Sequence, residues 1–367
     1  MPMIAAASRT ATSPDGKRTP MHGRLQSFRR QAAAWMAKRV FPHAANLVAP
    51  GELPRGGIQR ILVCRPNHRL GNTLMVTPLI AELEARFPGA EVDILGSGGA
   101  TQSVFAGYPS IGELFLLDRR ALRRPIATAR TISRLRTKRY DLVIDAASGS
   151  SSGRIASSMA QARFQVRVDG TPGAPAHFAM RPVHALRVAL GMPAADWPSL
   201  DLRLRDTERT TGMETLQRVL RAGPEGSTAP VLAIFPNATG AKRHDTAWWQ
   251  RFIAVLTAGI GERRIVELVA ADGMSRLDNA YPTYFTSDPR KLAAFIEAAG
   301  TYISADCGVM HLAAATRATT IGLFNRTDPK RYAPFGDGNA AVPCEDGCPE
   351  RTAARVATIL TSKGTFA

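Results

Sequence analysis

The sequence predicts an α/β protein built from two doubly wound domains that face each other across a cleft. From residue 60 onward, short β-branched runs alternate with helical segments, which is the pattern of βαβ units around parallel sheets. A stretch rich in Pro, Gly and polar residues near 190–230 interrupts this alternation, and the same pattern then begins again. With 367 residues, 45% of them hydrophobic, the chain is long enough for two cores.

We expect five parts along the chain. A basic and partly disordered N-terminal extension with an amphipathic helix precedes a first folded domain, a linker region, a second folded domain and a C-terminal tail. Their expected ranges are 1–58, 59–190, 191–230, 231–345 and 346–367. The carboxyl ends of both parallel sheets would then meet at a shared cleft, where ligands of such folds bind.

Short apolar runs define the expected strands. In the first half these runs are Ile61–Arg65, Glu91–Leu95, Glu113–Leu117 and Leu142–Asp145. A helix is expected over Thr73–Phe87 in the first half, and another begins near Thr246 in the second. The strands expected in the second half are Val231–Phe235, Arg264–Val269, Thr301–Ser304 and Thr319–Phe324.

The formal net charge of +17 is confined to two stretches. Residues 1–60 hold ten Lys/Arg and two acidic residues, residues 119–139 hold nine Lys/Arg and no acidic one, and the remainder holds 28 of each. Balanced charge over the body argues against nucleic-acid binding. An anionic lipid surface or a phosphorylated acceptor is therefore a better candidate than nucleic acid as the partner of the two basic stretches.

The first basic stretch contains an amphipathic segment at residues 23–40. Leu25, Phe28, Ala32 and Trp35 recur at helical spacing between basic residues, as in helices that lie on an anionic leaflet. Packing against the protein's own domain would produce the same pattern.

The second basic stretch, Arg119–Arg139, reads as a helix of the first domain. Its expected apolar contacts are Leu122, Ile126, Ile132 and Leu135. The basic side is either a solvated face or a platform for an acceptor.

Cysteine usage and hydropathy indicate a soluble cytoplasmic protein. Four cysteines do not form a disulfide framework for a chain of this size, and Cys344 and Cys348 lack the second pair that a zinc site needs. No run of about 20 uncharged apolar residues exists, and the first residues lack the apolar core of a signal peptide. We therefore expect loop thiols and no metal.

The loop after the first strand is basic and polar. Arg65 and Arg69 could bind phosphate, while Gly71 would permit a tight turn and close approach of a substrate. His68 or Asn72 could reach an acceptor hydroxyl. The loop has neither the Walker nor the Rossmann glycine pattern.

Two segments of the second half predict an anion site. Lys242 and Arg243 lie in a strand-to-helix loop and could neutralise a leaving phosphate. The segment from Ser304 to Ala315 reads as strand, turn and helix, where Asp306 could cap the helix or bind sugar hydroxyls and Gly308 could admit a ligand to the first-turn N–H groups.

Together, four pieces in order resemble glycosyltransferase family 9, the ADP-heptose:lipopolysaccharide heptosyltransferases and their relatives. The resemblance covers about residues 60–340. The matching pieces are the Arg-x-x-x-x-Leu-Gly loop up to Thr77-Pro78-Leu79, the strand Tyr140–Asp145, the loop from Pro236 to Lys242, and Asp306-x-Gly308-x-x-His311-Leu312-Ala313 followed by Gly322-Leu323-Phe324 and Thr327-Asp328-Pro329.

The resemblance implies a GT-B architecture with the acceptor on the N-terminal domain and the nucleotide-sugar on the C-terminal one. It implies inverting transfer of a heptose from ADP-heptose to a lipopolysaccharide core or similar glycan, without a required metal or cofactor. The enzyme would work at the inner face of the inner membrane as a peripheral protein. The donor-binding roles that the resemblance implies fall on Lys242, Asp306 and Gly308. We also expect Arg243, Cys307 and His311 at the donor site.

The chain departs from the family at the expected general base. The aspartate of the family's Leu-Gly-Asp is Asn72 here, and an amide does not accept a proton at neutral pH. Our hypothesis is that His68 takes over; the alternatives are another carboxylate or a catalytically impaired protein that binds nucleotide-sugars or acts as a membrane scaffold.

A second departure concerns the nucleoside. Val269-Ala270-Ala271-Asp272-Gly273 stands where the family often has a Gly-Gly pair before an acidic residue. Asp272 is a candidate ribose ligand, with a surface turn as its alternative role. Another nucleotide-activated sugar therefore stays open as the donor.

Overall fold

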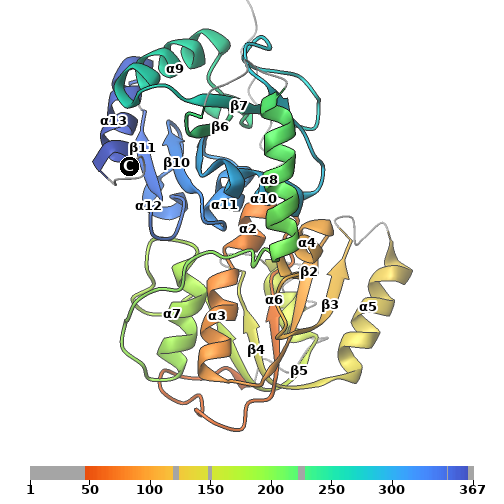
Figure 1. The fold of residues 1–367 in the computed structure, drawn as a ribbon. Helices are drawn as coiled ribbons and strands as arrows, with labels where there is room; N and C mark the ends of the chain where they lie inside the picture. Colours follow the sequence, from red (N-terminus) through yellow and green to blue (C-terminus); the bar gives the residue numbers. More distant parts are fainter. Residues whose placement is uncertain (1–45, 119–123, 148–150, 222–227, 345, 363–367) are drawn as a thin grey trace, which may run out of the picture. The chain divides into compact units, whose positions relative to one another are not determined.

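The computed structural model describes residues 46–118, 124–147, 151–221, 228–344 and 346–362. Its first half is a parallel sheet of five strands in the order β3-β2-β1-β4-β5 (Figure 1). The strands are β1 (Arg60–Cys64), β2 (Glu91–Ser97), β3 (Ile111–Leu117), β4 (Arg139–Asp145) and β5 (Gln161–Arg167).

The second half is a parallel sheet of six strands in the order β11-β10-β9-β6-β7-β8. Two parallel sheets with helices packed on them confirm the predicted α/β architecture. The strands are β6 (Val231–Phe235), β7 (Arg264–Leu268), β8 (Thr283–Tyr284), β9 (Thr301–Ala305), β10 (Thr319–Phe324) and β11 (Ala340–Pro343).

Helices connect the strands in both halves, as right-handed βαβ units require. Those up to the linker are α2 (Leu70–Leu74), α3 (Thr77–Arg86), α4 (Gly99–Phe105), α5 (Pro125–Thr137), α6 (Ser151–Ser158) and α7 (Met180–Ala189). Those after it are α8 (Asp206–Arg221), α9 (Thr246–Ile260), α10 (Pro289–Ala299), α11 (Gly308–Ala314), α12 (Pro329–Tyr332) and α13 (Pro349–Ser362), with a 3₁₀ turn η3 (Gly240–Lys242).

The helix predicted over Thr73–Phe87 is wrong in one respect, because the structure divides it into α2 and α3. Pro78 has no N–H to donate to the carbonyl of Leu74, so a continuous helix would lose that hydrogen bond. The hydroxyl of Thr77 donates to the Leu74 carbonyl instead, at 2.8 Å. The proline stands near the start of α3, where its missing N–H costs nothing.

Aspartate caps fix the start of several helices in the second half. The carboxylate of Asp245 accepts a hydrogen bond from the Trp248 N–H at 2.8 Å, which confirms a helix beginning at Thr246. Asp288 and Asp328 cap α10 and α12 in the same way, and each is followed by a proline.

The basic segment 119–139 is helical over α5, but its expected packing is partly wrong. Leu135 is fully buried as predicted, whereas Ile126 is 76% exposed. Ile126 stands at the second residue of the helix, beyond the reach of the sheet that covers Leu135. Leu122 lies outside the described residues.

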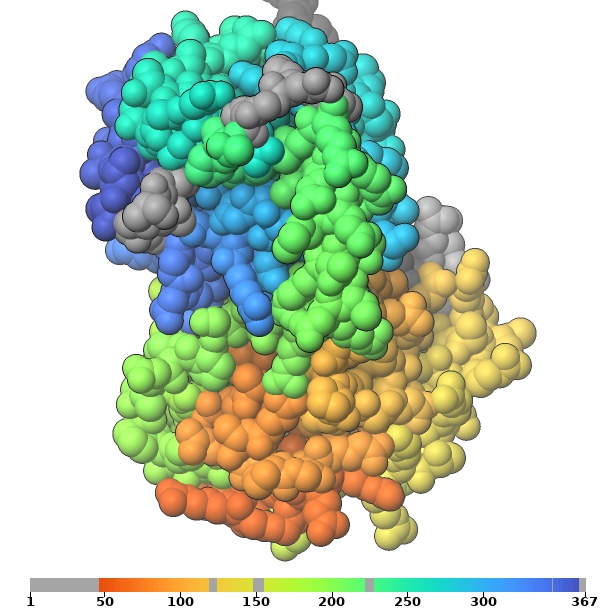
Figure 2. Space-filling view, in the orientation of Figure 1, coloured from red at the N-terminus to blue at the C-terminus, as the bar shows by residue number. Residues whose placement is uncertain are grey.

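The linker between the two sheets is anchored by one buried arginine of α10. The guanidinium of Arg290 donates to the carbonyls of Leu202 and Arg203, both at 3.0 Å, and to that of Ser103 at 3.1 Å. It also forms an ion pair with Glu208 in α8. Figure 2 shows α8 as a green ridge on the surface.

The predicted C-terminal tail contains α13. Val356 and Leu360 of this helix are fully buried in the core under the second sheet, together with Trp249 of α9. The predicted amphipathic segment 23–40 lies outside the described residues. Within the described part of the chain, no helix is both long and apolar enough to cross a membrane.

Candidate functional site

Each sheet has a topological switch point, where successive strands begin to be added on the opposite side, and predicted site residues follow the strands on both sides of it. In the first sheet this reversal of strand order lies between β1 and β4, whose carboxyl ends continue into Arg65 and Ala146. In the second it lies between β6 and β9, which lead to the Asn237 loop and to Asp306. Ligands of open parallel sheets bind at such reversals, because the connecting loops diverge there and leave a crevice.

Helices α2 and α11 bring the two reversals together. A Cβ built on Gly71 of α2 would stand 2.7 Å from Cδ2 of His311 and 3.6 Å from Cα of Gly308. Gly71 is a buried residue of α2 without a positive φ, so it does not form a tight turn, and its missing side chain lets α2 contact α11. A Cβ on Gly308 would meet only ordinary contacts, the nearest at 3.8 Å.

An ion pair joins the two predicted donor-binding segments. Nζ of Lys242 lies 2.5 Å from Oδ2 of Asp306, and the hydroxyl of Thr327 donates to the same oxygen at 2.6 Å. The Asp306 side chain is buried, while that of Lys242 keeps 29% of its surface exposed. The ammonium group therefore stands at the edge of the site, where an incoming anion can share it.

His311 lies behind this ion pair as a neutral imidazole. Burial lowers its pKa to about 4, and the charge of Lys242 acts in the same direction, against the opposing effect of the Asp306 carboxylate. Its Nδ1 is buried and has no hydrogen-bond partner among the described residues.

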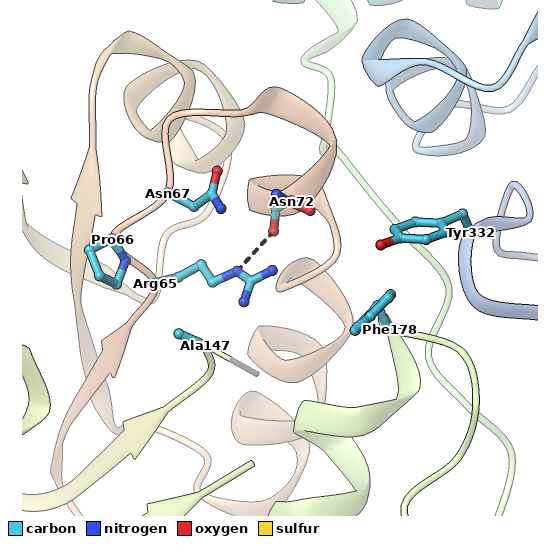
Figure 3. A pocket seen from close by; sticks show the side chains of 7 residues that line it. All are labelled: Arg65, Pro66, Asn67, Asn72, Ala147, Phe178 and Tyr332. Carbon is cyan, nitrogen blue, oxygen red and sulfur yellow. Dashed lines mark hydrogen bonds between the residues drawn. The ribbon is translucent and has the colours of Figure 1, made fainter. Parts of the chain in front are cut away.

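Arg65 stands in a cavity of about 170 Å³ at the first reversal (Figure 3). Its Nη1 donates to the Ala146 carbonyl at 2.9 Å, and its Nε donates to the Asn72 carbonyl at 3.4 Å. Burial lowers the pKa of Arg65, and the nearby Asp145 carboxylate raises it, so the guanidinium stays charged at neutral pH. The side chain of Asn72 lines the same cavity.

The side chains of four predicted residues form no hydrogen bond or ion pair with Lys242, Asp306 or Arg65 within the described chain. His68 and Arg69 are exposed in the loop between β1 and α2. Arg243 is exposed as well, and its Nε donates to the Ala238 carbonyl at 3.2 Å. Asp272 forms an ion pair with Arg276 and accepts a hydrogen bond from the Met274 N–H, an arrangement typical of a surface turn.

The cysteines have ordinary structural surroundings. Burial raises the pKa of the Cys307 thiol, whose Sγ lies 3.7 Å from the Ser304 hydroxyl. Cys344 is buried next to His244, and the thiol of Cys348 donates to Glu350 at 3.2 Å. No group of three or more His, Cys, Asp or Glu side chains within the described ranges is arranged to hold a metal ion.

Sequence reasoning missed the residues by which α12 contacts the first half. Nε2 of His177 donates to the Ala333 carbonyl at 3.0 Å, and Nδ1 accepts from the Ala179 N–H at 3.2 Å, which fixes a neutral tautomer. Next to it, the ring of Phe178 packs against Tyr332 with centroids 5.0 Å apart. These pairs are separated by more than 150 positions, so no local spacing could reveal them.

Comparison with known proteins supports the sequence prediction. The model of Glycosyltransferase family 9 (heptosyltransferase) matches residues 290–355, which include the Asp306 turn, Thr327 and Tyr332. The comparison with curated proteins finds no match.

Solved structures similar to this chain cover 83% of it. They include Escherichia coli heptosyltransferase WaaC with ADP, at 18% identity over 99% of that chain and a TM-score of 0.65. A glycosyl transferase family 9 protein from Veillonella parvula is 17% identical over 97% of its chain, with a TM-score of 0.65. E. coli ADP-heptose lps heptosyltransferase II is 16% identical over its whole length, with a TM-score of 0.62.

At these identities the structural likeness establishes the GT-B fold, and the match of residues 290–355 confirms the resemblance predicted from the motifs. The fold and the match over residues 290–355 together show that the chain is similar to the glycosyltransferases of family 9.

Proposed function

We propose that this protein is an inverting, metal-independent glycosyltransferase that moves a heptose from ADP-heptose to a lipopolysaccharide core or similar glycan. One observation carries the proposal: Lys242, Asp306 and Thr327 converge at the strand-order reversal of the second sheet. Gly308 and His311, which follow Asp306, lie against Gly71 of the first half. The similar structures of E. coli heptosyltransferase WaaC with ADP and with ADP-2-deoxy-2-fluoro heptose support the choice of donor.

The donor diphosphate would bind beside Lys242. Its negative charge competes with Asp306 for the ammonium group, and the partly exposed Nζ can serve both. Asp306, held by Lys242 and Thr327, would then orient its remaining acceptor positions toward sugar or ribose hydroxyls.

The reaction is a single displacement. An acceptor hydroxyl attacks the anomeric carbon as the bond from this carbon to the diphosphate oxygen breaks, and ADP leaves with the bonding electron pair. The hydroxyl proton passes to a general base, while Lys242 offsets the charge that develops on the leaving group.

His68 is our proposal for that base. It lies four residues before Asn72 on the loop that borders the Arg65 cavity, and a histidine has the intrinsic pKa suited to proton transfer near neutrality. Asn72 would orient the acceptor through its amide.

Titration with ADP-heptose and a turnover assay with truncated lipopolysaccharide test the proposal. Lys242→Ala should weaken donor binding by about 10- to 100-fold, the effect of losing one charge-assisted hydrogen bond of about 1.5–3 kcal/mol. Lys291→Ala removes an exposed lysine from the same half of the chain and serves as the matched control. Equal donor affinity in both variants would refute the proposed site, and parallel titrations with UDP- and GDP-sugars test the choice of donor.

A non-catalytic nucleotide-sugar-binding protein is the alternative. The observation that favours it is the amide of Asn72 at the position of the family's base, in a cavity whose described lining holds no carboxylate or imidazole. Donor binding without turnover on any truncated acceptor would support this alternative.

We also propose that residues 23–40 hold the protein on the inner face of the inner membrane. The proposal rests on the basic amphipathic sequence of this segment alone. Flotation with vesicles that contain anionic lipid should recover the full chain but not a variant lacking residues 1–42, and salt should weaken the association. Equal recovery of both proteins would refute it.

A further inference from the structure

The cavity around Arg65 has one polar wall and one aromatic wall (Figure 3). The polar wall consists of the Arg65 guanidinium and the amides of Asn67 and Asn72, all from the segment that follows β1. The aromatic wall consists of Phe178, which precedes α7, and Tyr332, the last residue of α12. The two halves of the chain therefore build this cavity jointly.

The aromatic wall is held in place without a ligand. The Phe178 and Tyr332 rings lie 5.0 Å apart at an angle of 44°, and the Phe178 N–H donates to the Arg331 carbonyl at 3.2 Å. The guanidinium groups of Arg181 and Arg331 lie 4.5 and 5.2 Å from the centre of the Phe178 ring. Because these contacts fix the rings, a ligand would meet a preformed surface and lose little affinity to ordering.

The polar wall is fixed as well. Two main-chain carbonyls orient Arg65, and Oδ1 of Asn67 accepts a hydrogen bond from the Arg69 N–H at 2.9 Å, which directs the amide NH₂ away from that contact. The hydroxyl of Tyr332 points toward this wall in Figure 3. Hydrogen-bonding groups therefore lie on one side of the cavity, and the two aromatic side chains close the other.

A sugar ring has the matching chemistry. Its C–H faces are apolar and pack on aromatic rings, while its edge carries hydroxyls that accept from a guanidinium and pair with amides. The cavity, at about 170 Å³, is smaller than the roughly 300–1,000 Å³ of pockets for drug-sized ligands. One sugar ring suits it better than a nucleoside diphosphate.

We propose that Phe178 and Tyr332 are specificity-determining residues that form the platform for the acceptor sugar. The inference rests on the proposed glycosyl transfer and deepens it. Tyr332 belongs to the half of the chain that holds the donor segments, so this half takes part in acceptor recognition too. The acceptor subsite needs both aromatic side chains, so it forms only when Tyr332 of α12 packs against Phe178 before α7.

The test measures binding of the oligosaccharide released from truncated lipopolysaccharide, in the absence of donor. Tyr332→Leu and Phe178→Leu should each raise its Kd about 10-fold or more, as expected when a stacking contact of about 1.4 kcal/mol is lost. Tyr332→Phe keeps the ring and should change the Kd less than 3-fold. Phe164→Leu, a partly buried phenylalanine of β5 outside the cavity, is the matched control and should bind as the wild type does.

The affinity for ADP-heptose, measured in the same variants, separates this inference from the proposed function. It should stay within 2-fold of the wild type, since among the described residues no hydrogen bond or ion pair joins either ring to Lys242 or Asp306. Oligosaccharide binding that is absent from the wild type or unchanged in Tyr332→Leu overturns the inference, as does an equal loss of donor affinity. Failure of the wild type to bind ADP-heptose refutes the proposed function instead, and leaves the oligosaccharide measurement to decide the platform.

Discussion

Replacing Gly71 by Ala tests the contact that joins the two halves of the site. The added Cβ would stand 2.7 Å from Cδ2 of His311, well inside the separation that carbon atoms tolerate. The His311 side chain is 4% exposed, so it cannot swing into solvent to make room. Either the ring leaves its position beside Asp306 or α2 moves away from α11.

The expected change in unfolding free energy for Gly71→Ala is the difference between two opposing effects. Overpacking a buried site by one methyl group costs about 1–3 kcal/mol. Alanine gains about 0.5–1 kcal/mol over glycine within a helix, and the backbone of Gly71 has no positive φ to oppose the change. The net loss of unfolding free energy should be about 0.5–2 kcal/mol.

Urea unfolding followed by tryptophan fluorescence gives the measurement, with Gly99→Ala as the control. A Cβ on Gly99, in α4, would meet nothing within 4 Å, so this variant should be as stable as the wild type or slightly more stable. The double variant Gly71→Ala/His311→Ala isolates the contact, because Gly71→Ala should cost nothing once the imidazole is gone. A Gly71→Ala protein as stable as the wild type, or one equally destabilised without His311, would refute the reasoning.

Three further predictions concern stability and catalysis. Because the pKa of His311 is about 4 in the folded state and near 6.5 in the unfolded state, the unfolded state binds the proton first as the pH falls. The contribution of this group to the unfolding free energy should be complete above pH 6.5, lower by about 2 kcal/mol at pH 5 and constant below pH 4. His311→Gln, titrated in parallel, should lack this loss of stability between pH 6.5 and pH 4. Arg290→Met removes the guanidinium donor from three carbonyls and from Glu208, which keeps only the Arg205 N–H, and should lower the unfolding free energy by about 3 kcal/mol. A loss below 1 kcal/mol would mean that water replaces the guanidinium. His68→Ala should slow transfer about 100-fold or more, and Asn72→Asp should restore the rate in that background; an unchanged rate in His68→Ala, with Lys242→Ala inactive, would exclude histidine as the base.

The sequence by itself determined the architecture and the order of the motifs. Alternation of β-branched runs and helical segments predicted two parallel sheets, because burial on both faces of a sheet selects such runs locally. Local chemistry also set helix starts, as at Asp245, whose carboxylate binds an N–H three residues later. The break at Pro78 was missed although its cause is equally local.

Only the tertiary structure decided which residues meet. Lys242 and Asp306 are 64 positions apart, and Phe178 and Tyr332 are 154 apart. Such pairs depend on how the two sheets and their loops pack, and hydrophobic periodicity predicts only local secondary structure, not these long-range contacts. Gly71 illustrates the difference: its type suggested a turn for a substrate, whereas the structure explains it by the imidazole of His311 from the other half of the chain.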